Sequence, residues 1–313
     1  MKVSLIATVL NEEKTIREFL ESIVAQTRFP DEVVIADGGS TDATLSVISN
    51  KYKRLKVTVI TKPGNRSVGR NEAIKHATGN IIVCTDGDCI LDKNWVRNII
   101  RPFIGQSVDV VAGYYRGRAD NLFQKCLVPY VLVMEERVVQ NTFLPASRTM
   151  AFRKSIWKSV GGFPEEYSHN EDHVFAKRLK KLGAKIVFTK DAIVYWRPRK
   201  DIKQAFTMFF RFAYGDAEAG IIRWRALFIF FRYFLGILLL IFSFFSRSLF
   251  LIEIIILCLI SYLSWSIQKN YRYIKNKTAF FWLPILQLTS DSAVLLGSLA
   301  GTGKRVWDIQ KKQ

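Results

Sequence analysis

The chain has 313 residues, of which 49% are apolar, and its 46 lysine and arginine residues against 27 acidic residues give a net charge of +19. This apolar content, with only 18 glycines and 8 prolines, excludes a disordered or collagen-like chain, and four cysteines are too few for a disulfide scaffold. The composition changes along the chain: residues 1–200 are typical of a soluble α/β domain, whereas residues 201–313 hold long apolar segments.

Strands and helices are predicted to alternate in the first 90 residues. The apolar pattern predicts strands at 3–9, 33–36, 56–60 and 81–84, of which the first two are buried. Helices are predicted between them at about 12–26, from Ser40 or Thr41 to 51, and at 68–77. This alternation forms right-handed βαβ units and a mainly parallel sheet, in which ligands bind beyond the carboxyl ends of the strands.

The loops after the second and fourth predicted strands are acidic. Asp86-Gly87-Asp88 is either a solvated turn or a metal site, because Mg²⁺ and Mn²⁺ take one or two carboxylates together with substrate phosphates. Such a metal neutralises the charge that builds on a departing diphosphate. Asp37, which closes the second strand, either forms an Asx turn or accepts hydrogen bonds from a nucleobase or ribose.

Two further motifs lie at the starts of predicted helices. The loop 64–71 brings Arg66 and Arg70 close to a helix N-terminus, which suits a diphosphate, although it lacks the ending of a P-loop. Glu171 and Asp172 begin a helix that is predicted to run to about residue 182. An acidic pair there either stabilises the helix dipole, by about 0.3–1 kcal/mol, or supplies a general base that takes a proton from an attacking hydroxyl.

Long apolar segments dominate the C-terminal part. Segments 226–246, 248–266 and 279–300 are each long enough to cross a bilayer, since about 20 helical residues span its core of about 30 Å. The third segment carries Pro284, Gln287 and Asp291, so crossing the membrane and lying in its interface remain equally open. We predict a catalytic domain over 1–200, an interfacial segment over 201–225 and a transmembrane region over 226–313.

Basic residues predict the orientation of these segments. They precede the first span and follow the second, so the positive-inside rule predicts a hairpin with the N-terminal domain in the cytoplasm. The basic C-terminal tail also suggests the cytoplasm, which conflicts with a third full crossing. Because the basic residues crowd the apolar spans, we assign them to anionic headgroups and topology, and to anionic substrates, rather than to nucleic acid.

The segment 201–225 is predicted to be an amphipathic helix in the membrane interface. Its apolar residues Phe206, Phe209 and Phe210 can face lipid while Lys203 and Arg211 stay near the headgroups. An ordinary packed helix is the alternative. An interfacial position implies a lipid-linked or membrane-borne acceptor.

Taken in order, these motifs resemble those of a known family. Asn11-Glu12, the loop 37–42, Gly69-Arg70-Asn71, Asp86-Gly87-Asp88, and Gly161-Gly162-Phe163 before Glu171-Asp172 are similar to those of family 2 glycosyltransferases over about residues 1–200. That family consists of inverting enzymes with the GT-A fold that use nucleotide-diphosphate sugars. The processive members' Gln-x-x-Arg-Trp signature is absent, because Gly220 stands three residues before Arg223.

The resemblance implies roles for particular residues. Asp172 would be the catalytic base, supported by Glu171, and Asp88 with Asp86 would bind Mn²⁺ or Mg²⁺. The nucleotide-sugar would be bound by Asp37, Arg66, Arg70, Asp86, Asn11 and Glu12. The implied activity is a hexosyltransferase type, acting at the membrane in cell-envelope polysaccharide synthesis.

Three other functions remain open. A polyprenyl-phosphate glycosyltransferase shares the fold and a membrane anchor, but its ionised acceptor needs no general base. A nucleotidyltransferase would need a Gly-rich, Arg-containing loop after the first strand, where Leu10-Asn11-Glu12-Glu13 stands instead. A non-catalytic membrane scaffold is disfavoured because the acidic motifs are intact.

Overall fold

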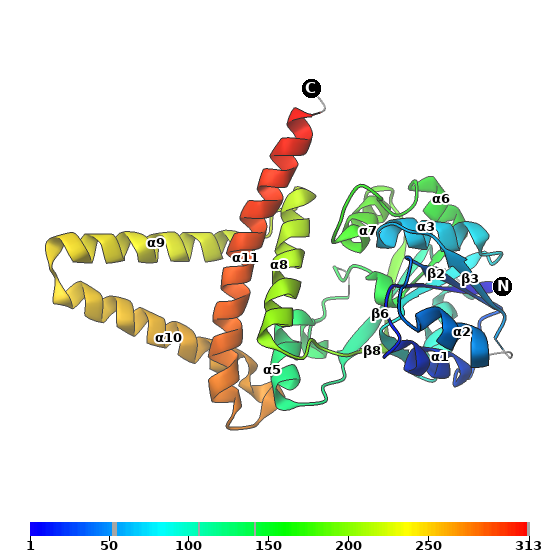
Figure 1. Ribbon diagram of the computed structural model, residues 1–313, viewed down its shortest axis with the longest axis horizontal. Coiled ribbons are helices and arrows are strands. Elements are labelled where there is room, and N and C mark those ends of the chain that lie inside the picture. The colour runs from blue at the N-terminus through cyan, green and yellow to red at the C-terminus, as the bar shows by residue number, and fades with distance from the viewer. Residues whose placement is uncertain (52–54, 106, 141, 312–313) are drawn as a thin grey trace. The chain divides into compact units, whose positions relative to one another are not determined.

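The computed structural model describes residues 1–51, 55–105, 107–140 and 142–311 (Figure 1). These residues form two compact units. The first comprises residues 1–118 and 133–197 and contains a β-sheet with helices, and the second comprises residues 119–132 and 198–313 and is helical.

A sheet of eight strands forms the centre of the first unit, in the order β3-β2-β1-β4-β7-β6-β8-β5. The strands are β1 Val3–Val9, β2 Glu32–Asp37, β3 Val57–Thr61, β4 Ile81–Asp86, β5 Cys89–Leu91, β6 Val110–Gly117, β7 Met150–Arg153 and β8 Ile186–Trp196. The four predicted strands, β1 to β4, pair in parallel as expected. Beyond them β7 runs antiparallel to both β4 and β6, β8 runs parallel to β6, and β5 runs antiparallel to β8. The sheet is therefore parallel in its predicted half and mixed in the rest.

Helices cover this sheet and hold the acidic segments in place. They are α1 Ile16–Val24, α2 Thr44–Lys51, α3 Arg66–His76, α4 Trp95–Ile100, α6 Lys154–Ser159 and α7 Glu171–Lys181. Phe175 of α7 is fully buried and stacks on Phe163 with ring centroids 4.0 Å apart, and it meets Phe152 of β7 edge-on at 5.7 Å. Burial of three such rings anchors α7, and with it the acidic pair at its start, to the sheet.

The helix α2 begins at Thr44, later than the sequence predicts. Ser40 and Thr41, the predicted caps, make other contacts: the Ser40 hydroxyl donates to Asp37, and the Thr41 amide donates to Asn11. Asp42 instead accepts from the backbone amide of Thr44 at 3.0 Å. The contacts with Asn11 join the loop after β2 to the loop after β1, and a sequence pattern does not show such contacts.

The second unit consists of α5 Leu122–Val131, α8 Ile202–Glu218, α9 Trp224–Ser246, α10 Leu249–Ile274 and α11 Ala279–Gln310. The short helix α5 lies inside the range predicted for the catalytic domain, but it belongs to the helical unit. Its Phe123 meets Trp282 of α11 edge-on at 5.0 Å, and the Tyr130 hydroxyl donates to the carbonyl oxygen of Leu283 at 2.7 Å.

Three helices of this unit, α9, α10 and α11, are long and apolar enough to cross a membrane by length and composition. This confirms the three predicted apolar helices and extends them to 23, 26 and 32 residues. Figure 1 shows α9 and α10 as a hairpin, and α8 beside α11. Within the most apolar stretch of each helix, 6% of the residues of α9 and of α10 are buried, against 33% for α11.

Candidate active site

The carboxyl ends of two strands that flank β1 bring Asp37 and Asp86 to the same edge of the sheet. Asp37 of β2 pairs with Val9 of β1, and Asp86 of β4 pairs with the adjacent residue, Thr8. Parallel strands end at a common edge, so the sequence prediction that both acidic turns lie there is confirmed.

Arg70 joins this edge to the start of α7. Its Nη1 donates to Glu171 Oε1 at 2.6 Å and its Nη2 donates to Asp86 Oδ1 at 2.9 Å. The Arg70 side chain is only 1% exposed, and its guanidinium lies 5.5 Å from the centroid of the Phe163 ring. An arginine that is this enclosed and paired twice is a structural link between the two acidic motifs.

Close packing of α3 on β1 positions Arg70. A Cβ at Gly69 would come within 3.0 Å of the Thr8 side chain, so the absence of a side chain lets the helix approach the strand. The Asn65 side chain caps α3 by accepting from the amide of Val68 at 3.1 Å. The helix therefore begins at Arg66 and turns Arg70 toward the sheet edge.

Asn71, the next residue on α3, fixes the loop that leads to α7. Its Oδ1 accepts from the Phe163 amide at 2.8 Å and from the Trp157 indole at 3.1 Å, and its Nδ2 donates to the Phe163 carbonyl at 2.8 Å and to Glu165 at 2.7 Å. Gly162, with φ of +79°, lies directly against this amide group. The motifs 69–71 and 161–163 therefore contact each other through the side chain of Asn71.

The environment of Asp172 raises its affinity for a proton. Burial and the negative charge of Glu171 raise the pKa of Asp172 above its usual value, although Arg70 partly offsets them. For Glu171 burial acts in the same direction, but Arg70 holds its pKa below the usual value. The pKa values of the two adjacent carboxyl groups are therefore shifted in opposite directions. Glu171 stays ionised beside Arg70, and Asp172 binds a proton more readily.

Backbone groups orient the Asp172 carboxylate. Its Oδ2 accepts from the amide of Ser147 at 3.2 Å, and its Oδ1 accepts from the amide of His173 at 2.8 Å. Ser147 lies in the 3₁₀ turn Ser147–Thr149, which immediately precedes β7. The Asp172 carboxylate is therefore held in part by a loop that the sequence analysis did not select.

Asp86 is strongly acidic. Burial would raise the pKa of its carboxyl group, but Arg70, followed by Arg148 and Arg66, lowers it below the usual value. Arg66 is exposed at the start of α3 and also contributes to the low pKa of Glu171. A positive field therefore surrounds the acidic edge, as an anionic donor requires.

Arg148 is a candidate residue that sequence reasoning missed. Its guanidinium lies 5.5 Å from the ring centroid of Tyr115 and 5.1 Å from that of Trp196. Burial alone would lower its pKa, but the acidic groups of Cys89, Asp86 and Asp88 raise it above its usual value. One arginine among 46 basic residues carries no local signal that could have singled it out.

Asp37, Asn11 and Glu12 organise the loops at this edge. The buried Asp37 carboxylate accepts from the amides of Gly39 and Ser40, both at 3.0 Å, so the local Asx-type turn is formed. Asn11, with φ of +55°, accepts from the Thr41 amide at 2.9 Å, and the Glu12 amide donates to Thr44 at 2.8 Å. Their predicted contacts with a nucleotide stay predictions.

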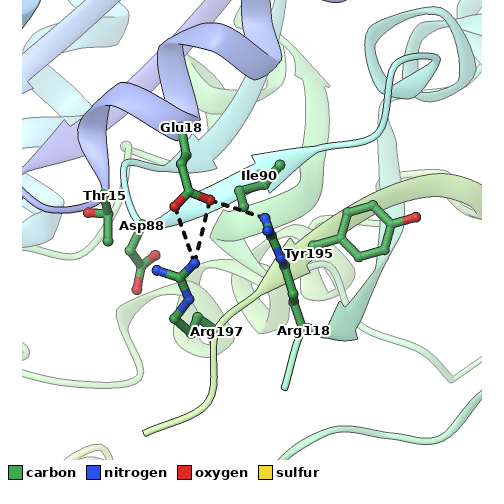
Figure 2. Close-up of a pocket in the computed structure, with 7 residues that line it drawn as sticks. All are labelled: Thr15, Glu18, Asp88, Ile90, Arg118, Tyr195 and Arg197. Carbon is green, nitrogen blue, oxygen red and sulfur yellow. Dashed lines mark hydrogen bonds and ion pairs between the residues drawn. The ribbon is translucent and has the colours of Figure 1, made fainter. Parts of the chain in front are cut away.

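Asp88 lines a small pocket beside this edge (Figure 2). Glu18 of α1 crosses the pocket to pair with Arg118 at 3.1 Å and with Arg197 at 3.2 Å. The other lining residues are Thr15, Ile90 and Tyr195. Two arginines and two carboxylates therefore line the pocket.

The carboxylates fit a divalent metal that arrives with a nucleotide. Among the residues that the structure describes, no three histidine, cysteine or acidic side chains form a cluster that could hold a metal ion. One oxygen of Asp86 is already bound to Arg70, while Asp88 is half-buried and borders the pocket. Two carboxylates suffice for Mg²⁺ or Mn²⁺ when phosphate oxygens complete the shell.

Comparison with known proteins agrees with this geometry. Residues 4–158 match the model of "Glycosyl transferase family 2". The chain is 25% identical over 223 residues to the O-antigen chain rhamnosyltransferase RfbN of Salmonella typhimurium, covering 66% of this chain and 71% of that protein. Residues 4–158 form a glycosyltransferase family 2 domain.

Two further comparisons bear on the fold. Over 216 residues the chain is 29% identical to the poly(ribitol-phosphate) beta-N-acetylglucosaminyltransferase TarS of Staphylococcus aureus, which is 64% of this chain but only 36% of that protein. The structure of the mannosyltransferase PcManGT from Pyrobaculum calidifontis, in complex with GDP-Man and Mn²⁺, matches 98% of this chain and 87% of its own with a TM-score of 0.67, at 18% identity. The fold is GT-A, as predicted, and the protein is a glycosyltransferase. The family match ends before Glu171, so the roles of the acidic pair depend on the geometry described above.

Proposed function

We propose that this protein is an inverting glycosyltransferase that moves a sugar from a nucleotide-diphosphate donor to a hydroxyl of a lipid-linked or membrane-borne glycan. The observation that carries this proposal is the asymmetry of the acidic pair. Glu171 is bound to Arg70, whereas the Asp172 carboxylate is held by the backbone amides of Ser147 and His173 and has a raised pKa. A general base is useful only if the acceptor must lose a proton.

The reaction would be a single in-line displacement. Asp172 takes the proton from the acceptor hydroxyl while that oxygen forms a bond to the anomeric carbon. The bond from the anomeric carbon to the diphosphate oxygen breaks, and the nucleoside diphosphate leaves with the electron pair. With no enzyme nucleophile, the configuration at the anomeric carbon inverts.

The residues around Asp86 would bind the donor. Asp88 and Asp86 would hold Mn²⁺ or Mg²⁺, which supplies positive charge for the departing diphosphate. Arg66 would contact the phosphates, and Asp37, Asn11 and Glu12 would line the nucleoside site. Because Arg70 is enclosed and paired twice, we assign it to positioning Asp86 and Glu171 more than to direct contact with the donor.

The helical unit would attach the enzyme to a membrane. We propose that α9 and α10 cross the bilayer as a hairpin, since each is apolar and only 6% buried along its most apolar stretch. Basic residues at 223 and 225 around the start of α9, and at 269, 272, 275 and 277 around the end of α10, support the cytoplasmic side for both the hairpin ends and the catalytic unit. We therefore expect the acceptor to be embedded in the same membrane.

The substitution Asp172→Asn in the full-length membrane protein tests this function. We expect product formation to fall by about 10²–10⁴-fold, which is the usual contribution of a general base, while binding of the nucleotide-sugar is retained. Asp191→Asn, at an exposed position of β8, is the matched control and should retain activity. Full activity of Asp172→Asn would favour the alternative, transfer to a polyprenyl phosphate, whose acceptor oxygen is already ionised.

A further inference from the structure

The helix α11 is as long as a transmembrane helix, but its neighbours are those of a helix that lies on the membrane surface. We propose that α11 does not cross the bilayer: it lies with α8 in the cytoplasmic interface, so that the protein crosses the membrane twice and its C-terminal end returns to the side where α9 begins. The inference rests on the proposed crossing of α9 and α10, and it adds the position of the third apolar helix relative to the bilayer.

Both ends of α11 meet the same end of the hairpin. The N-terminus of α11 follows α10 after a short turn, where Phe280 packs on Tyr271 with ring centroids 5.1 Å apart. Near its C-terminus, the Arg305 guanidinium lies against Gly220, just before the start of α9. Because α9 begins and α10 ends on one side of a membrane-crossing hairpin, both ends of α11 are brought to that side.

The close packing of α11 on α8 leads to the same conclusion. A Cβ at Gly297 would overlap the carbonyl oxygen of Phe210, and one at Gly301 would overlap that of Tyr214. The two helices therefore approach each other to backbone contact at these positions, and they lie side by side (Figure 1). If α11 crossed the bilayer, it would draw into the hydrocarbon core a 17-residue helix that carries Lys203, Arg211, Asp216 and Glu218. Among the described residues, α8 is not one of the helices that are both long and apolar enough to cross, since it has only 17 residues.

The exposed face of α11 suits an interface. Large apolar residues recur on it at spacings of seven, eleven and seven residues and so lie on one side of the helix. They are Phe281, Leu288, Leu299 and Val306, with exposed fractions of 59%, 38%, 60% and 49%. The opposite side is buried in the unit and includes Leu283, Leu286, Ala293, Gly297 and Gly301. An apolar stripe with Lys304 and Arg305 between its last two residues fits the headgroup region of the cytoplasmic leaflet.

An ion pair with a buried carboxylate joins the hairpin to α11. Asp291 is fully buried and accepts from Arg232 of α9 at 2.8 Å, from Tyr262 of α10 at 2.7 Å and from Tyr233 of α9 at 3.1 Å. Arg232 lies eight residues into α9, about 12 Å along the helix. A charge at that shallow depth is neutralised by a partner on a helix that lies near the same surface.

Cysteine labelling of the full-length protein in cells tests this topology. In a Cys258→Ser background, where the remaining cysteines are buried, Ser246→Cys, Asn276→Cys and Gln310→Cys report on the end of α9, the turn between α10 and α11, and the end of α11. With a membrane-impermeant maleimide we expect Ser246→Cys to react from outside, and the other two to react only after permeabilisation. Labelling of Gln310→Cys on the side opposite to Asn276→Cys would overturn the proposal.

The same experiment distinguishes this proposal from the proposed membrane crossing. If Ser246→Cys and Asn276→Cys react from the same side, the hairpin itself does not cross, and the proposal about α11 falls with it. If they react from opposite sides, the hairpin stands, and Gln310→Cys alone decides about α11.

Spin labels on the exposed stripe measure the depth of α11 independently. We place one label at a time at Phe281, Leu288, Leu299 and Val306 of the protein in lipid vesicles. The first and last positions are about 38 Å apart along the axis. An interfacial helix gives one common depth, within about 5–10 Å of the headgroup boundary. A depth that passes through the bilayer centre between Phe281 and Val306 would contradict the proposal.

Discussion

The guanidinium of Arg70 and the carboxylate of Glu171 are 101 residues apart in the chain and 2.6 Å apart in the interior of the first unit. This contact, together with the second ion pair to Asp86, decides how charge is distributed over the acidic residues of the site. Glu171 and Asp86 are held ionised, and the proton affinity of Asp172 rises beside them.

The substitution Arg70→Met should destabilise the protein strongly. It would leave Asp86 and Glu171 with no cation between them, and removal of one partner of a buried ion pair costs about 3–5 kcal/mol. Arg66→Met, at an exposed arginine one helical turn away, should change the free energy of unfolding by less than about 0.5 kcal/mol. Thermal unfolding of both variants measures the difference, and equal stabilities would show that the enclosed pairs do not hold this edge together.

The pH dependence of kcat/KM should reveal the raised pKa of Asp172. A base with a raised pKa loses its function at a higher pH than an ordinary aspartate, so activity should fall on acidification above about pH 4. Glu171→Gln removes the neighbouring negative charge, which lowers the pKa of Asp172, and the acidic limb should move to lower pH. The control Asp191→Asn should leave the limb in place. A limb that does not move in Glu171→Gln would mean that another group controls it.

Two adjacent glycines should differ in their tolerance of alanine. Gly161 and Gly162 have nearly equal φ of +78° and +79°, but a Cβ at Gly161 meets nothing within 4 Å, whereas a Cβ at Gly162 comes within 2.9 Å of Asn71 Oδ1. Gly161→Ala should cost only the backbone strain, about 1–2 kcal/mol. Gly162→Ala should cost about 1–3 kcal/mol more, because it disturbs the Asn71 contacts. Chemical denaturation of the two variants gives this difference directly. Equal losses in the free energy of unfolding would argue against a stabilising contact between Asn71 and residues 161–163.

Metal binding should depend on the nucleotide. Asp86 and Asp88 supply only part of a coordination shell, so Mn²⁺ alone should bind weakly and bind more tightly when UDP or GDP supplies phosphate oxygens. Isothermal titration calorimetry with and without the nucleotide measures the change. Asp88→Asn should abolish the enhancement, while Asp191→Asn should preserve it. Tight binding of Mn²⁺ without nucleotide would contradict this account.

The ion pair between Arg232 and Asp291 should stabilise the helical unit as a pair. Asp291→Leu alone leaves Arg232 without its carboxylate, so it should lower the thermal midpoint of the protein in detergent more than the double variant Arg232→Leu/Asp291→Leu does. A double-mutant cycle isolates the coupling of the two residues. If the two single effects add, the helices are held by apolar packing alone.

Much of the fold could be predicted from local patterns. The alternation of short apolar runs with helical segments located β1 to β4 to within two residues at every boundary. Three of these strands, β1, β2 and β4, are nearly continuous buried runs, and β3 is a short β-branched run at the sheet edge. The other four strands were not predicted, since β5 and β7 have only three and four residues, and β6 and β8 lie between loops without a clear period. Short strands are defined by their partners in the sheet and much less by their own residues.

The family motifs, the acidic turns at the strand ends and the three long apolar helices could all be predicted from the amino-acid order, because spacing and composition are properties of contiguous residues. Folding was needed to show that Arg70 joins Asp86 to Glu171, that the Ser147 amide orients Asp172, and that Arg148 lies within the electrostatic reach of Asp86 and Asp88. It also decided that α5 packs with the helices and that α11 contacts α8 along its length. These contacts join residues that are distant in the chain, and both the pKa of a carboxylate and the neighbours of an apolar helix depend on which distant groups folding brings to them.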